Sequence, residues 1–350
     1  MKTITSKEIE RVMNIGRGKL SNNSIIICGR EYHIGSKVVL WDDPNGLNGY
    51  DTSKKAYRIR DRKTGEVIKK VISGKRYNNR VWNVNFDKLK NIVTQFFLHH
   101  SGLYHADATF SVLHNERGLS CHFILDDDGT IYQTLDLKEN AWHGGQCNKM
   151  SIGIEIDSRA SAGRFPNAYD ADSCKKYDVL PREKRLDKVN GSWALGYDFN
   201  DKQYEALIKL AIALKDIFPH ISSNPDFPRK NGRIRKVEVN NIKKHKGFVC
   251  HFQASSNKID PISFDFNRFL SGVLSNSPNV KSNISALSST MEIQEWLTSK
   301  NISPGMIDGL MGPKTEKAIK YFQNLVGLQT DGKWNDKLDY FVNWIGETEI

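Results

Sequence analysis

Three side chains that can bind a metal ion stand at the ends of apolar segments. His99 follows the apolar run 96–98, His251 follows the run 247–250, and Asp260 lies in the loop after the second run. Two histidines and a carboxylate, with a fourth position open to water, form the kind of ligand set that a catalytic zinc ion uses. The spacing equally allows a structural role, in which His99 closes the end of a strand.

Two charged residues have positions that suit catalysis beside such a metal. Glu155 lies in the middle of the apolar run 152–156, where burial raises the pKa of a carboxyl group toward neutrality. A carboxylate with such a pKa suits a general base that acts on water. Lys258 precedes Asp260 by two residues, and its ammonium group can stabilise a developing oxyanion. A buried salt bridge for Glu155 and an exposed cation at Lys258 are the structural alternatives.

The elements that position these residues include several strands. Apolar runs predict strands at 96–98 and 152–156. The turn sequence 126–129, Asp-Asp-Asp-Gly, predicts a hairpin between strands at 119–125 and 130–135. Strands that alternate with helical segments from about residue 85 onward indicate an α/β domain.

Helices are expected on both sides of a polar segment at 158–200. Residues 106–115 can form the first helix. The second begins after Asn200, which caps it together with Gln203, and its apolar stripe reaches Leu214. The segment 158–200 itself is predicted to be an irregular insertion or a long surface loop.

The two ends of the chain differ from this central part. Residues 1–90 are basic and β-rich, and they begin with a short amphipathic helix near 6–15. Residues 275–290 are rich in serine and asparagine, which predicts a linker. Residues 291–345 are predicted to form a small unit of three helices.

Charge and composition limit the classes of function. The 350 residues carry a formal net charge of +11, which favours an anionic partner: a nucleic acid, a membrane surface or an anionic wall polymer. No apolar run reaches the length of a membrane span, so no membrane insertion is expected. The five cysteines show no CxxC spacing and indicate neither a disulfide framework nor a thiolate zinc site. Charges near the N-terminus predict synthesis in a cytoplasm without a signal peptide.

Five stretches between residues 93 and 270 occur in the order seen in one enzyme family. They are Phe97-Leu98-His99-His100-Ser101, Arg117-Gly118-Leu119-Ser120-Cys121-His122-Phe123, Asp128-Gly129-Thr130-Ile131-Tyr132-Gln133, Ala141-Trp142-His143, and Asn148 to Glu155. Together they resemble the zinc N-acetylmuramoyl-L-alanine amidases of the type 2 amidase, or peptidoglycan-recognition, family. The resemblance implies a mixed central β-sheet flanked by helices and a catalytic domain at 91–274.

The resemblance also implies roles for individual residues. One Zn²⁺ ion is expected on His99, His251 and Asp260, with Asp260 in the family's Lys-x-Asp-Pro signature. Glu155 and Lys258 match the catalytic positions of the family.

Residues that contact the substrate are also expected from the family. Trp142 and His143 match a motif that lines the substrate groove, and Asn148 is expected to bind substrate with them.

Some positions depart from the family pattern. Cys121 stands where some members carry a catalytic tyrosine, so the base role is assigned to Glu155. His245 is a rival for His251, but no Lys-x-Asp-Pro follows it at the expected distance. A segment like Trp41 to Tyr50 precedes the zinc strand in some bacterial amidases, which predicts that the N-terminal region packs on the catalytic domain.

The C-terminal unit has a resemblance of its own. The sequences Gln294-Glu295-Trp296-Leu297, Ile307-Asp308-Gly309 and Gly312-Pro313-Lys314-Thr315 resemble peptidoglycan-binding type 1 domains. The two resemblances imply a hydrolase that cleaves the amide between N-acetylmuramic acid and L-alanine in peptidoglycan. The protein is expected to be a monomer. No motif supports a nucleic-acid partner.

A phage endolysin that reaches the cell wall after release from the cytoplasm fits this modular chain. A lysin carried in the virion tail, an injected antibacterial effector and a non-catalytic peptidoglycan-recognition protein are the alternatives.

Overall fold

The computed structural model describes most of the chain. It covers residues 23–53, 56–58, 70–275, 289–325, 330–335 and 338. The predicted helix at 6–15, most of the predicted linker and the end of the C-terminal unit lie outside these residues. Among the described residues, no helix is long and apolar enough to cross a membrane.

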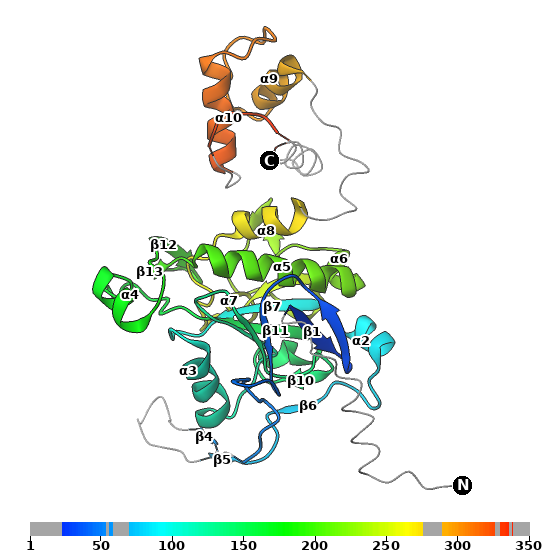
Figure 1. Cartoon of the computed structure of the whole chain (residues 1–350). Coiled ribbons are helices and arrows are strands. Elements are labelled where there is room, and N and C mark those ends of the chain that lie inside the picture. Colours follow the sequence, from blue (N-terminus) through cyan, green and yellow to red (C-terminus); the bar gives the residue numbers. More distant parts are fainter. Residues whose placement is uncertain are drawn as a thin grey trace.

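A six-stranded mixed sheet forms the centre of the protein (Figure 1). The strand order is β16-β7-β11-β8-β9-β3; β8 and β9 pair antiparallel and every other neighbouring pair is parallel. The strands are β3 (Val38–Leu40), β7 (Gln95–His100), β8 (Phe123–Leu125), β9 (Ile131–Gln133), β11 (Ser151–Ile156) and β16 (Gly247–Cys250). The predicted mixed α/β class and the predicted hairpin after residue 119 are confirmed.

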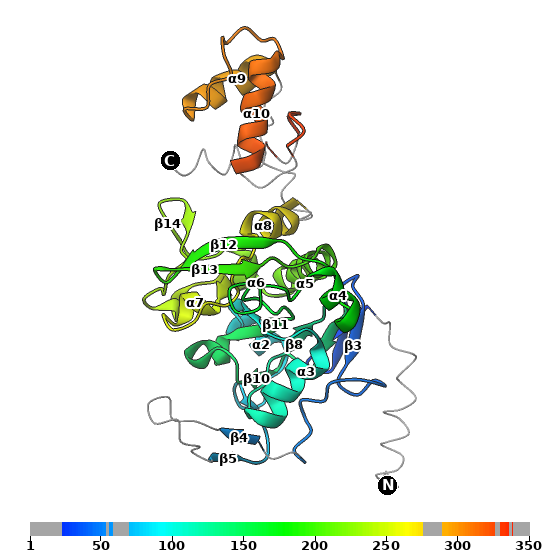
Figure 2. The same ribbon diagram turned by 90° about the vertical axis from the view of Figure 1, so that its left-hand side faces the viewer.

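Helices cover both faces of this sheet (Figures 1 and 2). On one face lie α5 (Asp201–Ile217) and α8 (Phe266–Ser275), and on the other lies α3 (Ala106–Phe110). Helix α5 begins where the sequence predicts, because the Asn200 side chain accepts a hydrogen bond from the Gln203 backbone N–H. The predicted helix at 106–115 changes its hydrogen-bond pattern after α3 and continues as a π-helix, Ser111–Glu116.

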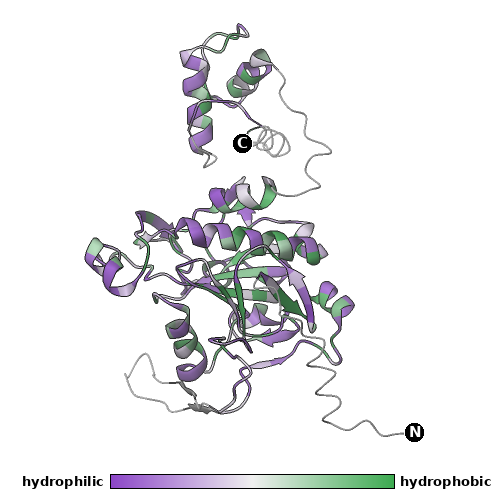
Figure 3. Cartoon of the chain, in the orientation of Figure 1, coloured by the Kyte–Doolittle hydropathy of each residue, from purple (hydrophilic) through white to green (hydrophobic). Residues whose placement is uncertain are grey.

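Successive side chains of the central strands point to opposite faces of the sheet. One face packs on the main core, and the other carries a different set of side chains. Phe96 and Leu98 of β7 belong to the main hydrophobic core together with Leu210 of α5. Phe97 packs on the other face in a smaller cluster, and His99 shares its face because it lies two residues further along the strand. Figure 3 shows that hydrophobic residues are concentrated on the strands of the central sheet.

Short hairpins and helices surround the sheet. The hairpins and strand pairs are β1 (Ser24–Ile27) with β2 (Arg30–His33), β4 (Ala56–Arg58) with β5 (Lys70–Ile72), β6 (Tyr77–Asn79) with β10 (Glu139–Ala141), β12 (Lys184–Val189) with β13 (Ser192–Tyr197), and β14 (Arg229–Lys230) with β15 (Arg233–Ile234). The other helices are α2 (Phe86–Ile92), α4 (Ala171–Tyr177), α6 (Pro219–Ser222), α7 (His251–Ala254) and the 3-10 helices Gly145–Met150 and Ile242–Lys244.

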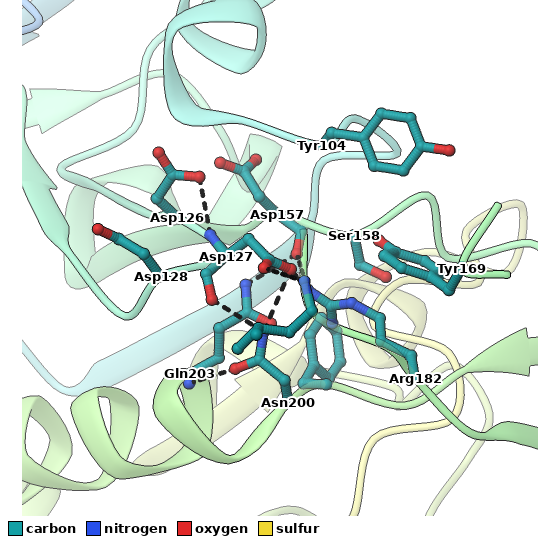
Figure 4. Close-up of polar contacts among 12 residues, drawn as sticks. Tyr104, Asp126, Asp127, Asp128, Asp157, Ser158, Tyr169, Arg182, Asn200 and Gln203 are labelled. Atoms are coloured by element: carbon teal, nitrogen blue, oxygen red, sulfur yellow. Dashed lines mark hydrogen bonds and ion pairs between the residues drawn. The ribbon is translucent and has the colours of Figure 1, made fainter. Parts of the chain in front are cut away.

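The prediction of irregular structure at 158–200 is wrong for much of that segment, which contains α4 and the β12–β13 hairpin. A buried ion pair fastens the segment to the domain (Figure 4): Arg182 Nη2 lies 2.5 Å from Asp127 Oδ1. The Arg182 guanidinium also donates to the carbonyl oxygens of Asp157 and Asp198, each at 3.1 Å. Gln203 of α5 donates to the Asp157 carbonyl at 2.8 Å, so one polar network joins the insertion, β11 and α5.

The C-terminal unit has its own small core. Helices α9 (Thr290–Ser299) and α10 (Pro313–Leu325) pack through Ile293, Leu297 and Phe322. The third predicted helix falls largely outside the described residues.

Two glutamines give the C-terminal unit an internal repeat. Gln294 donates to the Asp308 carboxylate at 3.0 Å, and Gln323 donates to the Asp331 carboxylate at 2.7 Å. The Asp-Gly turns that the sequence shows twice are therefore held in the same way in the structure.

Candidate active site

Side chains from two neighbouring strands and the following loop meet at one end of the sheet. His99 is the fifth residue of β7, His251 directly follows β16, and Asp260 lies in the loop after α7. His99 Nδ1 lies 2.9 Å from His251 Nδ1 and 3.1 Å from Asp260 Oδ2, and His251 Nδ1 lies 2.8 Å from Asp260 Oδ2. In the described part of the chain, this is the one cluster of at least three such groups with the spacing of a metal site.

The chemistry of this cluster fits zinc. Imidazole nitrogens and a carboxylate oxygen are ligands that zinc accepts, and bonds of about 2.0–2.1 Å around a tetrahedral ion would separate the ligand atoms by roughly 3.3 Å. The observed separations of 2.8–3.1 Å are a few tenths of an ångström shorter, so small outward movements of the rings accommodate the ion.

The protonation states of the cluster also suit metal binding. Burial, followed by the charge of His251, lowers the pKa of His99 to about 4, so this ring is neutral near pH 7. Burial opposes ionisation of Asp260, but the adjacent His251 and His99 rings outweigh it and hold the pKa of this carboxyl well below its ordinary value. A neutral imidazole and an ionised carboxylate are the forms that bind a metal.

A directed chain of hydrogen bonds runs from His99 into the protein. His99 Nε2 lies 3.0 Å from His143 Nδ1, and His143 Nε2 lies 3.2 Å from Ser151 Oγ. The Ser151 hydroxyl donates its one proton to the carbonyl oxygen of Cys147 at 2.8 Å, so it accepts from His143 Nε2. His143 Nδ1 is then an acceptor, and His99 donates from Nε2 and keeps the lone pair of Nδ1.

The His143 ring is fixed by its surroundings. Gly153 leaves the space that the ring occupies, because a Cβ atom at this position would lie 2.5 Å from His143 Nδ1. Phe97 meets the ring edge to face with centroids 5.3 Å apart. Asn148 Oδ1 accepts the backbone N–H groups of His143 and Gly144 at 3.2 and 2.6 Å. These contacts leave the ring one orientation for its bond to His99.

Glu155 lies directly beside His99 on the neighbouring strand. The parallel register of β11 and β7 pairs the two residues, and only 8% of Glu155 is exposed. Burial, followed by the charges of Asp260 and Asp157, raises the pKa of Glu155 well above its ordinary value. A carboxyl group with this environment can hold and release a proton near neutral pH.

The cluster opens into a cleft of about 510 Å³. The predicted site residues line this cleft: His99, Trp142, His143, Asn148, Glu155, His251, Lys258 and Asp260. The structure therefore brings together side chains that are up to 161 positions apart in the sequence.

Two other histidines do not join the metal cluster. His245 Nε2 lies 3.1 Å from the carbonyl oxygens of Asp226 and Phe248. His100 Nδ1 accepts the Ile262 N–H at 3.2 Å.

Sequence reasoning missed several residues at the site. Arg117 lines the cleft, and its charge partly counteracts the rise in the pKa of Glu155. Thr109 lines the cleft as well, and its hydroxyl donates to Asp157 at 2.5 Å. Ser151 and the buried Arg80 support the site from behind, since Arg80 donates to the Ser151 carbonyl at 2.8 Å. Arg117 belongs to a stretch that carries the family resemblance, whereas Arg80 has no local signal.

An α/β domain with a polar cleft, in which histidines and a buried carboxyl group meet, has the groups needed for acid–base and metal-assisted chemistry. Sequence comparison identifies the family. The profile of N-acetylmuramoyl-L-alanine amidases matches residues 89–263, and the profile of a putative peptidoglycan binding domain matches residues 288–338. The chain belongs to the N-acetylmuramoyl-L-alanine amidase family, and both resemblances drawn from the sequence are confirmed.

Similar individual proteins carry related names. The chain is 28% identical over 217 residues to N-acetylmuramoyl-L-alanine amidase CwlH of Bacillus subtilis (strain 168), which covers 60% of this chain and 71% of that protein. A solved structure of an AmpD derivative is 18% identical, covers 57% of this chain and 90% of its own, and has a TM-score of 0.34. AmpDh3 from Pseudomonas aeruginosa is 15% identical, covers 73% and 91%, and has a TM-score of 0.34.

Proposed function

We propose that this protein is a zinc-dependent amidase that hydrolyses the bond between N-acetylmuramic acid and L-alanine in bacterial peptidoglycan. The observation that carries the proposal is one cleft that holds a His-His-Asp cluster with atoms 2.8–3.1 Å apart and a buried carboxyl group on the adjacent strand. Family membership and the matched peptidoglycan binding domain support the substrate class.

His99, His251 and Asp260 would hold one Zn²⁺ ion. When bound, zinc polarises a carbonyl group and lowers the pKa of water, which makes hydrolysis of an amide possible at neutral pH. His143 and Ser151 support this role of His99, because their hydrogen bonds keep its Nδ1 atom unprotonated. They act as positioning residues.

Glu155 acts as the general base and then as the general acid. Its carboxylate takes a proton from the attacking water and later delivers this proton to the nitrogen of the leaving L-alanine. The raised pKa of Glu155 suits both halves of this cycle. The Lys258 ammonium group stabilises the oxyanion that forms from the carbonyl oxygen, an effect worth about 3–4 kcal/mol for one such donor.

Binding of the polymer involves two parts of the chain. Trp142, His143 and Asn148 line the cleft and are proposed to contact the substrate around the scissile bond. Residues 291–345 are proposed as the wall-binding unit, joined through a linker at 275–290 to a catalytic domain at 91–274 that carries the N-terminal region. Tethering raises the local concentration of the catalytic domain on the wall.

The proposed setting is host lysis by a phage endolysin that acts as a monomer on the cell wall. The net charge of +11 supports an anionic polymer as the partner. A tail-borne lysin and an injected effector would use the same chemistry. A gene beside a holin gene supports the endolysin, and a gene among tail genes contradicts it.

The activity is tested by digesting purified peptidoglycan and labelling newly exposed amino groups. The proposal predicts new amino-terminal L-alanine in proportion to enzyme and time. Glu155→Gln is the matched control, because it removes the proton acceptor, is nearly the same size and leaves the three proposed ligands in place. This variant should bind zinc and wall but release no L-alanine. Release at the parent rate would refute the base role, and new reducing sugar ends alone would refute the proposed reaction.

A further inference from the structure

The β12–β13 hairpin carries large apolar side chains on its outer face. Leu186 and Trp193 are each 64% exposed, and Leu195 is 38% exposed. Leu186 pairs with Leu195 and Lys188 pairs with Trp193 in the antiparallel register, so these side chains lie on the same face of the ribbon. Contiguous apolar surface on a soluble domain marks an interaction site more often than scattered apolar residues do.

The inner face and the turn of the hairpin attach it to the catalytic loop. Asp187 accepts hydrogen bonds from Lys236 Nζ at 2.6 Å and from the Ser263 N–H at 3.2 Å. At the turn, Asn190 Nδ2 donates to the carbonyl oxygens of Lys258 at 2.9 Å and Phe252 at 3.2 Å. Lys258 lines the cleft, so the hairpin adjoins the candidate active site.

Uncompensated positive charge accompanies the apolar face. Lys188 Nζ lies 5.5 Å from the centre of the Trp193 ring, and Lys184 is the first residue of the same strand, β12. Lys230 and Arg233 are exposed on the β14–β15 hairpin, which lies beside β12 and β13 (Figure 2). The ion pairs of the described residues include none of these four cations.

From these features we infer that the outer face of the β12–β13 hairpin is an accessory surface for the peptidoglycan strand outside the cleft. This inference rests on the proposed function. A cleft of about 510 Å³ holds a segment of drug-like size, so a polymer bound there must continue over neighbouring surface. The indole of Trp193 offers a flat apolar face to sugar rings, and the lysines offer partners to the carboxylates of stem peptides.

Other occupants match this surface less well. In a symmetric dimer the same face would meet itself and gather Lys184 and Lys188 of both copies in one interface, which like charges disfavour. A nucleic acid would use the cations but would leave Leu186 and Leu195 without apolar partners.

The test compares the full-length protein with Trp193→Ala on two soluble substrates, a disaccharide-pentapeptide and a glycan strand of many such repeats. The inference predicts about a tenfold higher half-saturating concentration of the strand for the variant. Its kinetics on the disaccharide-pentapeptide should stay within about twofold. Trp82→Ala is the matched control, since Trp82 is 81% exposed in the loop between β6 and α2 and should leave both substrates unaffected.

Binding measured without hydrolysis separates this inference from the proposed function. In a Glu155→Gln background, Trp193→Ala should weaken calorimetric binding of the strand about tenfold. Equal binding by both proteins would overturn the inference even if the amidase activity is present. Absence of hydrolysis in the parent together with weakened strand binding would refute only the proposed function. A dimer or a nucleic-acid complex that disappears with Trp193→Ala would assign the surface to that partner and overturn the inference.

Discussion

The Nε2 atom of His99 lies 3.0 Å from the Nδ1 atom of His143, a residue 44 positions away in the sequence. This contact determines which nitrogen of His99 is free, because His143 accepts at Nδ1 and therefore forces His99 to donate from Nε2. Ser151 sets the direction of these hydrogen bonds, because its hydroxyl donates to a backbone carbonyl that can only accept.

Removal of the Ser151 hydroxyl should weaken metal binding. In Ser151→Ala, His143 loses the acceptor for its Nε2 proton, so the tautomer and orientation of His99 are no longer enforced. We expect the Kd for zinc to rise about 10–100-fold, measured by competition with a chromophoric chelator. NMR of the metal-free parent should show the proton of His99 on Nε2.

Thr134→Val is the matched control for this prediction. The Thr134 hydroxyl is also buried and donates to a carbonyl oxygen, that of Cys121 at 2.5 Å, but it has no connection to His99. Its loss should reduce stability by about 1 kcal/mol and leave the zinc Kd unchanged. An unchanged zinc Kd in Ser151→Ala, or a proton on His99 Nδ1 in the metal-free parent, would contradict the positioning role.

Lys258→Met should lower kcat about 10²–10³-fold with little change in KM, because the ammonium group is proposed to act on the oxyanion more than on the bound substrate. The loop should keep its shape, since Asn190 bonds to the backbone carbonyl of Lys258 and not to its side chain. Steady-state kinetics on a soluble muramyl peptide measure this effect. A kcat equal to that of the parent would exclude the proposed oxyanion role.

The stability of the protein should depend on pH through Asp157. This carboxyl group is fully buried, and burial, followed by the charge of Asp126, raises its pKa well above the ordinary value. The folded state therefore retains a proton that the unfolded chain releases above about pH 4. Stabilisation from this group is complete below the unfolded pKa and is lost as pH rises through the folded pKa.

Asp157→Asn removes this titration. Between about pH 4 and 7 the free energy of unfolding of the parent should fall more steeply than that of the variant, by up to about 1.4 kcal/mol per pH unit. Urea unfolding at several pH values measures both slopes. Parallel curves for the two proteins would show that Asp157 is not held protonated in the folded state.

The buried pair between Arg182 and Asp127 should be required for a stable insertion. Arg182→Met leaves the Asp127 charge buried without its partner, which costs about 3–5 kcal/mol in such pairs. In the double variant Arg182→Met/Asp127→Leu, neither charge remains and part of the lost stability should return. Urea unfolding tests both. If the free energy of unfolding of Arg182→Met falls by less than about 1 kcal/mol, the pair does not support the insertion.

The elements that the sequence predicts well are those with a strong local pattern. Residues 96–98 of β7 are all apolar because both faces of this strand are covered. The pair Asn200 and Gln203 is a local capping signal that marks the start of α5. The prediction of an irregular segment at 158–200 overlooks a local signal of this kind in the turn of the β12–β13 hairpin. Asn190 and Gly191 both adopt positive φ angles in its turn, and an Asn-Gly pair between two strands indicates a hairpin.

The features that sequence reasoning misses depend on distant contacts. The strands on either side of Asn190 look unlike buried strands, because their outer face is exposed and β12 consists mostly of charged residues. Arg182 pairs with Asp127, which is 55 positions away in the sequence, and Arg80 donates to Ser151, which is 71 positions away. No local pattern encodes such pairings. The side chains proposed to act on the chemistry lie on or after strands and fit a family pattern, whereas Arg80, which supports Ser151 from behind, has no local signal.

The proposed role of His99, His251 and Asp260 is to hold the metal on which hydrolysis depends. It is tested by measuring, in the same preparations, zinc per chain and the rate of L-alanine release for the parent, His99→Ala and the control His245→Ala. This role predicts one zinc per chain and full activity for the parent and for His245→Ala, and loss of both for His99→Ala. Full zinc occupancy in His99→Ala, or undiminished release of L-alanine by the parent after complete removal of zinc, would contradict it.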